Sequence, residues 1–391
     1  MEIKNIEPDY LSEFKNLLKY CFGLEEDELE LFSEYLYKPE NCFGIFTDNQ
    51  LAASLSIIPY QMYFNGNTVG MGGISAVSTF PEYRNNHYAE KLIINSLQVM
   101  RGRGDYFSLL DPFSYSFYRK YGWESVLEYK KYNFKIDHLK KFKRFQNYKF
   151  KKIGEKDLTS IIRVYEAYIK KYNGPLKRNK KDWKFRFKKH RQENIYRYGC
   201  LDDKENLKGY IFFKLKDNKI NIEELSYINH EVKKEIFSFI YSHNPQLQNI
   251  NWLSPADDNT ILMLDDPGRE YEISLGMMGR IIDVKKVLET YTIPDKVDTS
   301  FTLKVKDPYA EWNNKIFEII LKNKKVKVNV IDKKTENVDV FCSIQALSQL
   351  VSGYINLKER INLGGIKGDK NKFGLLDYLV PERNTYLNDF F

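Results

Sequence analysis

The residues best suited to chemistry lie between Gly72 and Glu124. A basic turn, Arg84 to Ala89, separates a strand of β-branched residues from an amphipathic helix. The unpaired amides and the dipole of a helix start attract anions, and Arg84 adds a positive charge suited to a pyrophosphate. We therefore expect an anion-binding turn, with an ordinary connection between strand and helix as the alternative.

Tyr118 is the second candidate, in the aromatic sequence FYRKYGWE after another apolar strand. A phenol can hydrogen-bond or protonate a departing thiolate. A free tyrosine has a pKa near ~10 and a thiol near ~8.5, so full proton transfer is uphill by roughly 2 kcal/mol. We predict hydrogen-bond stabilisation with late transfer. Packing is the alternative for Tyr118, and Tyr115 and Tyr121 are expected to be structural.

The strand before the basic turn is the third feature. Backbone groups of Val77 and Thr79 can hold an extended ligand that lies like an added strand. The side chains of Ile74, Ala76 and Val77 are also expected to line a core. Both roles are compatible, because only backbone atoms would bind the ligand.

Helices and strands alternate around these residues from residue 1 to about 140. Asp9 or Ser12 is expected to cap a first helix that ends at Phe22. The further expected elements are a helix over 27–37, strands over 42–47, 52–58 and 70–79, a helix over 88–100 and a strand over 106–110. Tyr118 then falls on a short turn.

The rest of the chain repeats a mixed pattern. Residues 138–150 are basic and predict a hinge. Beyond it we expect helices over 158–172 and 231–240 and strands over 210–215 and 220–227, with no basic turn between strand and helix. From Met277 a strand leads into a helix capped by Asp283, and antiparallel strands and a helix over 343–353 follow.

Composition narrows the class of protein. The 391 residues, 42% of them hydrophobic, are enough for two to three packed domains. The absence of a long apolar run and of a basic-then-apolar N-terminus predicts neither a membrane span nor a secretory signal, so a cytoplasmic location is expected. The net charge of +8 is a weak indication of nucleic-acid binding, and the basic run from Lys177 to Arg191 is expected to be a solvated helix face.

Cysteines and histidines give no sign of a metal site. The four cysteines share no C-x-x-C spacing, and the five histidines form no pair at i, i+4. We predict no metal.

Three stretches, VSTFPEYRNNHYAEKL, LLDPFSYSFYRKYGWE and MMGRIIDVKKVLE, and the aromatic C-terminus resemble the Eis-type (enhanced intracellular survival) N-acetyltransferases of the GNAT superfamily. The resemblance covers nearly the whole chain. It implies an α+β or α/β fold: two GNAT-like mixed-sheet domains at 1–142 and 143–284, the second without a cofactor site, and a sterol-carrier-like α+β domain at 285–391.

The resemblance also implies an activity. Such proteins use acetyl-CoA as co-substrate to acetylate several amines of aminoglycosides, which confers antibiotic resistance, and they form hexamers. The superfamily turn reads Arg or Gln, two residues, Gly, one residue, then Gly or Ala. This sequence matches at Arg84 and Ala89 and has His87 where glycine is usual.

Carried over by residue, Tyr118 would be the general acid and the carboxylate of Phe391 the general base. An α-carboxylate has a pKa near ~3.5, so taking a proton from an ammonium near ~8 costs roughly 6 kcal/mol unless a water bridges or the amine arrives neutral. The implied acetyl-CoA contacts are Val77, Thr79, Arg84, Asn85, His87, Tyr88 and Ser114. The implied substrate contacts are Glu25, Glu26, Asp27 and Asp389, and acid that favours the helix dipole is the alternative for the first three.

Two other functions stay open. The same chemistry could acetylate a protein lysine or a polyamine. Alternatively, the chain could be a non-enzymatic acyl-CoA-binding or lipid-binding protein with a degenerate coenzyme turn at His87.

Overall fold

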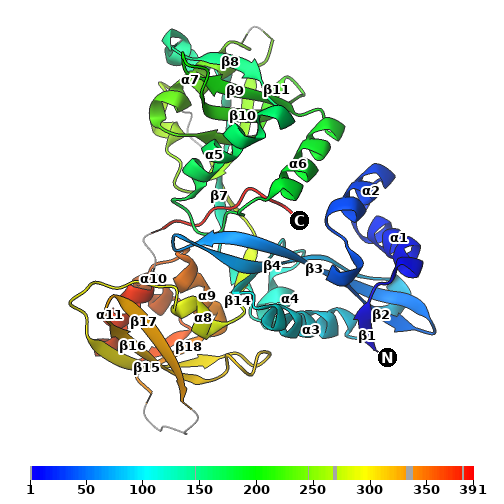
Figure 1. Ribbon diagram of the computed structural model, residues 1–391, viewed down its shortest axis with the longest axis vertical. Helices are drawn as coiled ribbons and strands as arrows, with labels where there is room; N and C mark the ends of the chain where they lie inside the picture. The colour runs from blue at the N-terminus through cyan, green and yellow to red at the C-terminus, as the bar shows by residue number, and fades with distance from the viewer. Residues whose placement is uncertain (1, 146, 245, 267–270, 332–337, 381–382) are drawn as a thin grey trace. The chain divides into compact units, whose positions relative to one another are not determined.

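A computed structural model describes residues 2–145, 147–244, 246–266, 271–331, 338–380 and 383–391. Internal contacts divide the chain into two compact units. Unit 1 comprises Met1–Leu127, Gly276–Thr385 and Asp389–Phe391, and unit 2 comprises Glu128–Leu275 and Tyr386–Asn388. Unit 1 holds two β-sheets and unit 2 holds one (Figure 1).

The first sheet of unit 1 contains the four strands expected over 42–110 and three others, one near the N-terminus and two farther along the chain. Its order is β1 (Ile3–Asn5), β2 (Cys42–Thr47), β3 (Gln50–Phe64), β4 (Asn67–Thr79), β5 (Phe107–Leu110), β14 (Met278–Ile281) and β6 (Glu124–Ser125). Only β4 and β5 are parallel; the other neighbours are antiparallel. β14 thus lies between β5 and β6 in a sheet that otherwise comes from the N-terminal third of the chain.

Helices on this sheet largely follow the expected pattern. They are α1 (Leu11–Phe22), α2 (Glu26–Tyr35), α3 (Tyr88–Arg103) and α4 (Tyr115–Lys120), with 3-10 turns at Pro8–Tyr10, Pro39–Asn41 and Pro81–Tyr83. The expected cap of α1 by Asp9 or Ser12 is wrong, because the 3-10 turn leads directly into the helix and Tyr10 is the N-cap residue without a side-chain bond. Tyr118 lies on the helix α4 rather than on a turn.

The second sheet of unit 1 comes from the C-terminal part of the chain. Its order is β17 (Lys325–Ile331), β16 (Ile316–Lys322), β15 (Thr299–Lys306), β18 (Val340–Ser343) and β19 (Ile366–Gly368). The helices of this part are α8 (Val284–Leu288), α9 (Ile344–Ser352), α10 (Leu357–Asn362), α11 (Lys370–Leu376) and the 3-10 turn Asp377–Leu379. The expected cap is confirmed, since Asp283 Oδ1 accepts from the amide of Lys286 at 3.1 Å.

The described residues of unit 2 form one mixed sheet and three α-helices. The strand order is β13 (Glu272–Leu275), β7 (Glu128–Lys135), β12 (Asn249–Pro255), β11 (Lys219–Tyr227), β10 (Leu207–Lys216), β9 (Tyr196–Leu201) and β8 (Lys149–Lys152). The helices are α5 (Leu158–Ile169), α6 (Lys180–Gln192) and α7 (His230–Tyr241), with 3-10 turns at Ile136–Arg144, Glu155–Asp157 and Thr260–Met263. The hinge predicted at 138–150 is wrong, because Leu139 and Phe142 of the first turn are buried in the core against α7.

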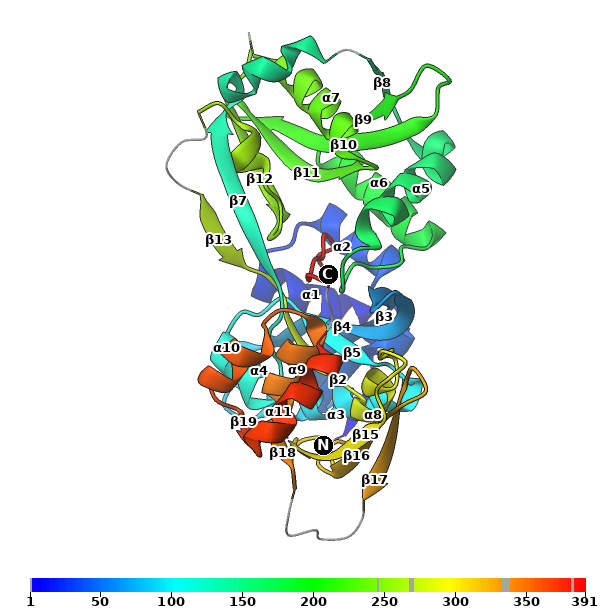
Figure 2. The same cartoon turned by 90° about the vertical axis from the view of Figure 1, so that its left-hand side faces the viewer.

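Helices of unit 2 cover both faces of its sheet (Figure 2). Val232 and Ile236 of α7 share a core with Ile211 of β10. His190 of α6 packs on the next residue of β10, Phe212, with ring centroids 5.1 Å apart. Successive residues of a strand point to opposite faces, so α6 and α7 lie on different sides of the sheet.

The basic run before and along α6 is partly used inside unit 2. Arg178 Nη1 lies 2.9 Å from Glu224 Oε1, and Arg186 Nη1 lies 3.1 Å from the other carboxylate oxygen. The lysines that remain exposed are Lys177, Lys180, Lys181 and Lys184. The run therefore divides into buried ion-pair partners and a solvated helix face.

The predicted fold class is confirmed. Each of the three sheets combines parallel and antiparallel strand pairs, and helices pack on the sheets. The domain boundaries at 142/143 and 284/285 stay predictions, because the compact units describe internal contacts and not domains. No helix in the described ranges is long and apolar enough to cross a membrane.

A buried ion pair joins β14 to the segment after β15. Arg280 Nη2 lies 2.5 Å from Asp307 Oδ2, and both side chains are fully buried. We expect Asp307→Ala to lower the free energy of unfolding by about 3–5 kcal/mol, because the guanidinium stays buried without its counter-ion. Urea denaturation followed by circular dichroism measures the change. Asp298→Ala, which breaks the exposed pair with Lys322, is the control and should cost less than about 1 kcal/mol; equal costs would contradict the prediction.

Candidate functional site

The site begins where two parallel strands separate. β4 and β5 are paired from Met71 with Phe107 to Ile74 with Leu110. β5 ends at Leu110, whereas β4 continues to Thr79. Among the described strands, only β3 pairs with β4 beyond this point. The other edge of β4 is therefore open to an extended ligand.

A β-bulge re-aims this open part of β4. The register between β3 and β4 shifts there, and Ala76 has a left-handed φ of +54°. The Ala76 carbonyl accepts hydrogen bonds from Ser54 Oγ at 3.1 Å and Ser78 Oγ at 3.3 Å. Because a bulge bends its strand, it redirects the backbone groups of Val77 and Thr79. The bulge has no local sequence signal, since alanine is uncommon at positive φ.

The basic turn is exposed and ends in a left-handed residue. His87, the N-cap residue of α3, has φ +59°, which is the conformation that glycine adopts most easily. Its side chain is 75% exposed and places Nδ1 3.2 Å from Glu90 Oε2. The first helical bond runs from Lys91 N to His87 O at 3.1 Å, so the amides of residues 88–90 point out of the helix start.

Glu90, which was not among the residues expected at the site, places a negative charge in the first turn of α3. Lys120 Nζ lies 3.4 Å from its carboxylate. Burial acts to raise the pKa of Glu90, but hydrogen bonds from Tyr121, Lys120 and His87 lower it overall. Glu90 is therefore ionised, and its charge is offset by that of Lys120.

Tyr118 is held in the core of unit 1 by α4. Ser114 is the N-cap residue of that helix, and its Oγ accepts from the amide of Phe117 at 3.4 Å. Tyr118 is only 2% exposed and belongs to the same buried cluster as Ile74 and Leu110. The phenol ring thus lies in the core that also contains the last paired residues of β4 and β5, and it packs on Phe113 and Phe117.

The surroundings of Tyr118 keep its hydroxyl protonated. Burial raises the pKa of Tyr118 well above its ordinary value near 10, and the negative charge of Asp111 raises it further. A phenol in this state is a hydrogen-bond donor at neutral pH and a poor source of a free proton.

Phe391 reaches the same part of β4. A Cβ atom on Gly73 would lie 2.6 Å from Cε2 of Phe391, so the ring rests directly on the glycine. The ring also packs on Tyr60, with centroids 5.0 Å apart. Gly73 and Ile74 face opposite sides of the sheet, so Phe391 and the cluster of Tyr118 reach neighbouring residues of β4 from opposite faces. Two adjacent glycines within a strand were the signal for this close approach.

The acidic residues expected to bind substrate lie at the start of α2 and near the C-terminus. Glu25, Glu26 and Asp27 are exposed, and Glu26 lies 3.6 Å from Lys15 Nζ. The amide of Glu25 donates to Glu28 Oε2 at 3.1 Å, a capping contact of a helix start. These acids lie outside the buried cluster of Tyr118. Asp389 is partly buried in unit 1.

Three segments of the sequence match known domain families. Residues 2–126 and 174–281 match families described as acetyltransferase (GNAT) domains. Residues 284–388 match a sterol carrier protein domain. Among curated proteins, none matches the sequence.

Solved structures share the fold over the whole chain. A protein of unknown function from Enterococcus faecalis, described as a probable N-acyltransferase, is 23% identical, with all of this chain and 99% of that chain covered and a TM-score of 0.90. A GCN5-related N-acetyltransferase from Anabaena variabilis is 23% identical, with 100% of both chains covered and a TM-score of 0.87. Eis1 from Mycobacterium abscessus is 14% identical, with 100% of both chains covered and a TM-score of 0.81. At these identities the likeness shows the fold.

The contact between the Phe391 ring and Gly73 can be tested by adding one methyl group at residue 73. We expect Gly73→Ala to displace the Phe391 ring and to lower acetyl transfer at least tenfold, while the thermal unfolding midpoint changes little. Gly102→Ala is the control, because a Cβ there meets nothing within 4 Å. Steady-state kinetics and thermal denaturation measure both variants. Equal activity in the two variants would contradict the placement.

Proposed function

We propose that this acyltransferase, which has the two GNAT domains and the sterol carrier protein domain of the Eis type, transfers the acetyl group of acetyl-CoA to amines of cationic small molecules. Multi-site acetylation of aminoglycosides, and hence antibiotic resistance, is the first candidate. One observation carries the proposal: β4 and β5 separate at Ile74 and Leu110, which share a buried cluster with Tyr118, and Phe391 packs on the neighbouring Gly73.

Acetyl-CoA would lie along the open edge of β4. The bulge at Ala76 turns backbone groups of Val77 and Thr79 towards a pantetheine arm. The pyrophosphate would bind at the start of α3, where amides and the helix dipole favour an anion and Arg84, Asn85 and Tyr88 surround it. His87 supplies the left-handed turn while its ring stays exposed, so the side chain leaves the amides accessible. Ser114, the N-cap residue of α4, would contact the thioester end of the coenzyme.

The reaction forms one bond and breaks another. The amine nitrogen attacks the thioester carbonyl, a C–N bond forms, and the C–S bond breaks to release a thiolate. Tyr118 donates a hydrogen bond to the departing sulfur and passes its proton late, because its raised pKa disfavours early transfer. An ammonium substrate first gives one proton to the carboxylate of Phe391 through a water, whereas a neutral amine needs no such step. After attack the nitrogen loses a second proton to the same water, and solvent returns a proton to Tyr118, so the products are the amide and the free thiol.

Charge would bring a cationic substrate to this site. Glu25, Glu26 and Asp27 form an exposed acidic rim on a chain of net charge +8, and Asp389 lies two residues from the terminal carboxylate. Negative rims raise the local concentration of polycations. A protein lysine or a polyamine would use the same chemistry, and substrate profiling separates these substrates. Hexameric assembly and a cytoplasmic location belong to the same proposal.

Tyr118→Phe tests the general acid. We expect kcat to fall about 10²- to 10⁴-fold with little change in coenzyme affinity, because only the departing thiolate loses its partner. A thiol-release assay with kanamycin or neomycin measures this loss. Tyr115→Phe, on the same helix, is the control and should stay close to the wild type. Because the pKa of Tyr118 is raised, its titration should cause no loss of kcat below pH ~10. An alkaline limb below that pH that disappears in Tyr118→Phe would contradict this role.

The terminal carboxylate tests the general base. We expect a Gly-Ser extension after Phe391, or a C-terminal amide made by protein ligation, to reduce acetylation at least a hundredfold. Calorimetry should show unchanged binding of acetyl-CoA, since β4 and α3 are untouched. The amide is the sharper variant because it keeps the Phe391 ring on Gly73. Full activity of the amide would rule out the carboxylate as base.

A further inference from the structure

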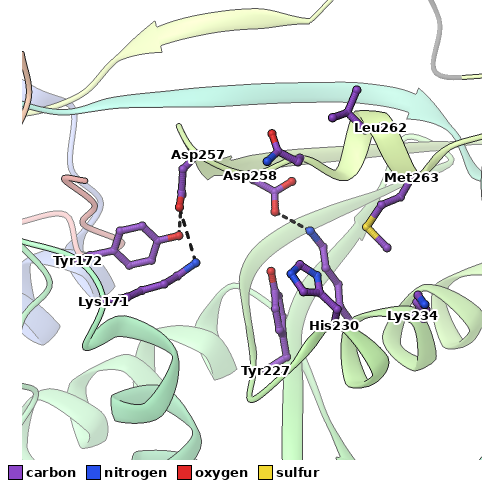
Figure 3. A pocket seen from close by; sticks show the side chains of 11 residues that line it. Lys171, Tyr172, Tyr227, His230, Lys234, Asp257, Asp258, Leu262 and Met263 are labelled. Atoms are coloured by element: carbon purple, nitrogen blue, oxygen red, sulfur yellow. Dashed lines mark hydrogen bonds and ion pairs between the residues drawn. The ribbon is translucent and has the colours of Figure 1, made fainter. Parts of the chain in front are cut away.

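Unit 2 contains a cavity of about 520 Å³ that the proposed acetyl transfer does not use. Its walls are the end of β11, the first turns of α7, the segment after β12, and Lys171 and Tyr172 after α5 (Figure 3). Sites for small molecules usually have volumes of this order. The cavity is thus large enough for a molecule of nucleotide size.

The cavity lies at a strand, turn and helix in the order that unit 1 uses for its site. β11 and β12 are parallel from Lys219 with Asn249 to Ile222 with Trp252, and β11 then continues towards α7 paired with β10. The connection to α7 is short, however, and Asn229 Oδ1 caps it by accepting from Val232 N at 3.0 Å. Side chains, rather than a long basic loop, therefore have to form any site here.

One wall of the cavity is rigidly held. Lys233 Nζ lies 2.6 Å from Asp258 Oδ2, and these side chains are 1% and 3% exposed. The other carboxylate oxygen of Asp258 accepts from Thr260 N at 2.8 Å. The Asp258 carbonyl accepts from Tyr132 at 2.9 Å and from Lys130 at 2.7 Å. Burying an ion pair carries a desolvation penalty that apolar residues would not have. The pair holds this wall in one arrangement in the absence of a ligand.

The acidic groups of the cavity are already engaged. Asp257 accepts from the Tyr172 hydroxyl at 2.7 Å and lies 3.7 Å from Lys171 Nζ, and Asp258 is held by Lys233. The lining contains three lysines and two aspartates, so its lysines exceed its aspartates by one positive charge. The positive end of the α7 dipole adds to it. A cation would have to displace a lysine, whereas an anion would not.

Another part of the lining is apolar. Leu262 and Met263, on the 3-10 turn after β12, line the cavity, and Leu262 is 80% exposed. We propose that the cavity binds a phosphate ester of nucleotide size. Its phosphate lies at the start of α7 beside His230 and Lys234, and its organic part rests on Leu262 and Met263. This site is separate from the acetyl-transfer site of unit 1.

The test uses the full chain saturated with coenzyme A, so that the anion turn of unit 1 is filled. Adenosine 5′-monophosphate and inorganic phosphate are titrated in turn by isothermal calorimetry. We expect the nucleotide to bind one-to-one and at least tenfold more tightly than phosphate. Lys234→Glu should weaken nucleotide binding at least tenfold and leave acetyl transfer unchanged. Lys216→Glu, an exposed charge reversal at the end of β10, is the control and should change the affinity less than twofold.

Three results would overturn the proposal: no saturable heat from either probe at millimolar concentration, equal affinity for nucleotide and phosphate, or equal binding in the two lysine variants. The thermal unfolding midpoint of each variant is measured to show that it is folded. If the chain binds no coenzyme A but binds the nucleotide through Lys234, the proposed coenzyme site is wrong and the cavity of unit 2 stands.

Discussion

The site of unit 1 depends on the point at which the parallel pairing of β4 and β5 stops. Up to Ile74 and Leu110 the backbone groups of the two strands satisfy each other. Beyond it β4 has an open edge, and a strand edge is the part of a sheet that an extended ligand can pair with. The bulge at Ala76 and the start of α3 could contact such a ligand only because this edge is open. Tyr118 belongs to the buried cluster that contains Ile74 and Leu110, so the chemistry proposed for this chain depends on where the short strand β5 ends.

Unit 2 repeats the parallel pairing but differs in the connection that follows it. Eight residues separate β4 from α3, and they leave room for a turn with exposed amides. Two residues separate β11 from α7, and Asn229 takes one of the first amides of the helix. Because unit 2 lacks a long loop at this position, the polar groups near the start of α7 are buried side chains, above all Lys233 and Asp258. The length of one connection therefore decides whether backbone or side chains can bind a ligand.

Local features of the site were predictable from the sequence, and features that depend on distant pairing were not. The helix α3, the capping by Asp283 and the order of strand, basic turn and tyrosine follow from periodicity and residue type within short windows. The pairing of β14 with β5 joins residues more than 160 positions apart in the chain, and no local sequence pattern predicts this pairing. The bulge at Ala76 depends on the register with β3. The contact of Phe391 with Gly73 was predictable only in part. Adjacent glycines in a strand indicate that another group approaches closely, but they do not indicate which residue it is.

The two groups proposed for acid and base chemistry are poorly matched to full proton transfer. Burial moves the pKa of Tyr118 further above that of a thiol, and an α-carboxylate is a weak base for an ammonium. Catalysis at such a site cannot rest on strong proton exchange. It has to rest on holding a neutral amine against the thioester and on a hydrogen bond that strengthens as the sulfur becomes negative. This requirement explains why both groups are fixed by packing, Tyr118 in the core and Phe391 against Gly73. In the proposed reaction, position contributes more to the rate than acid or base strength.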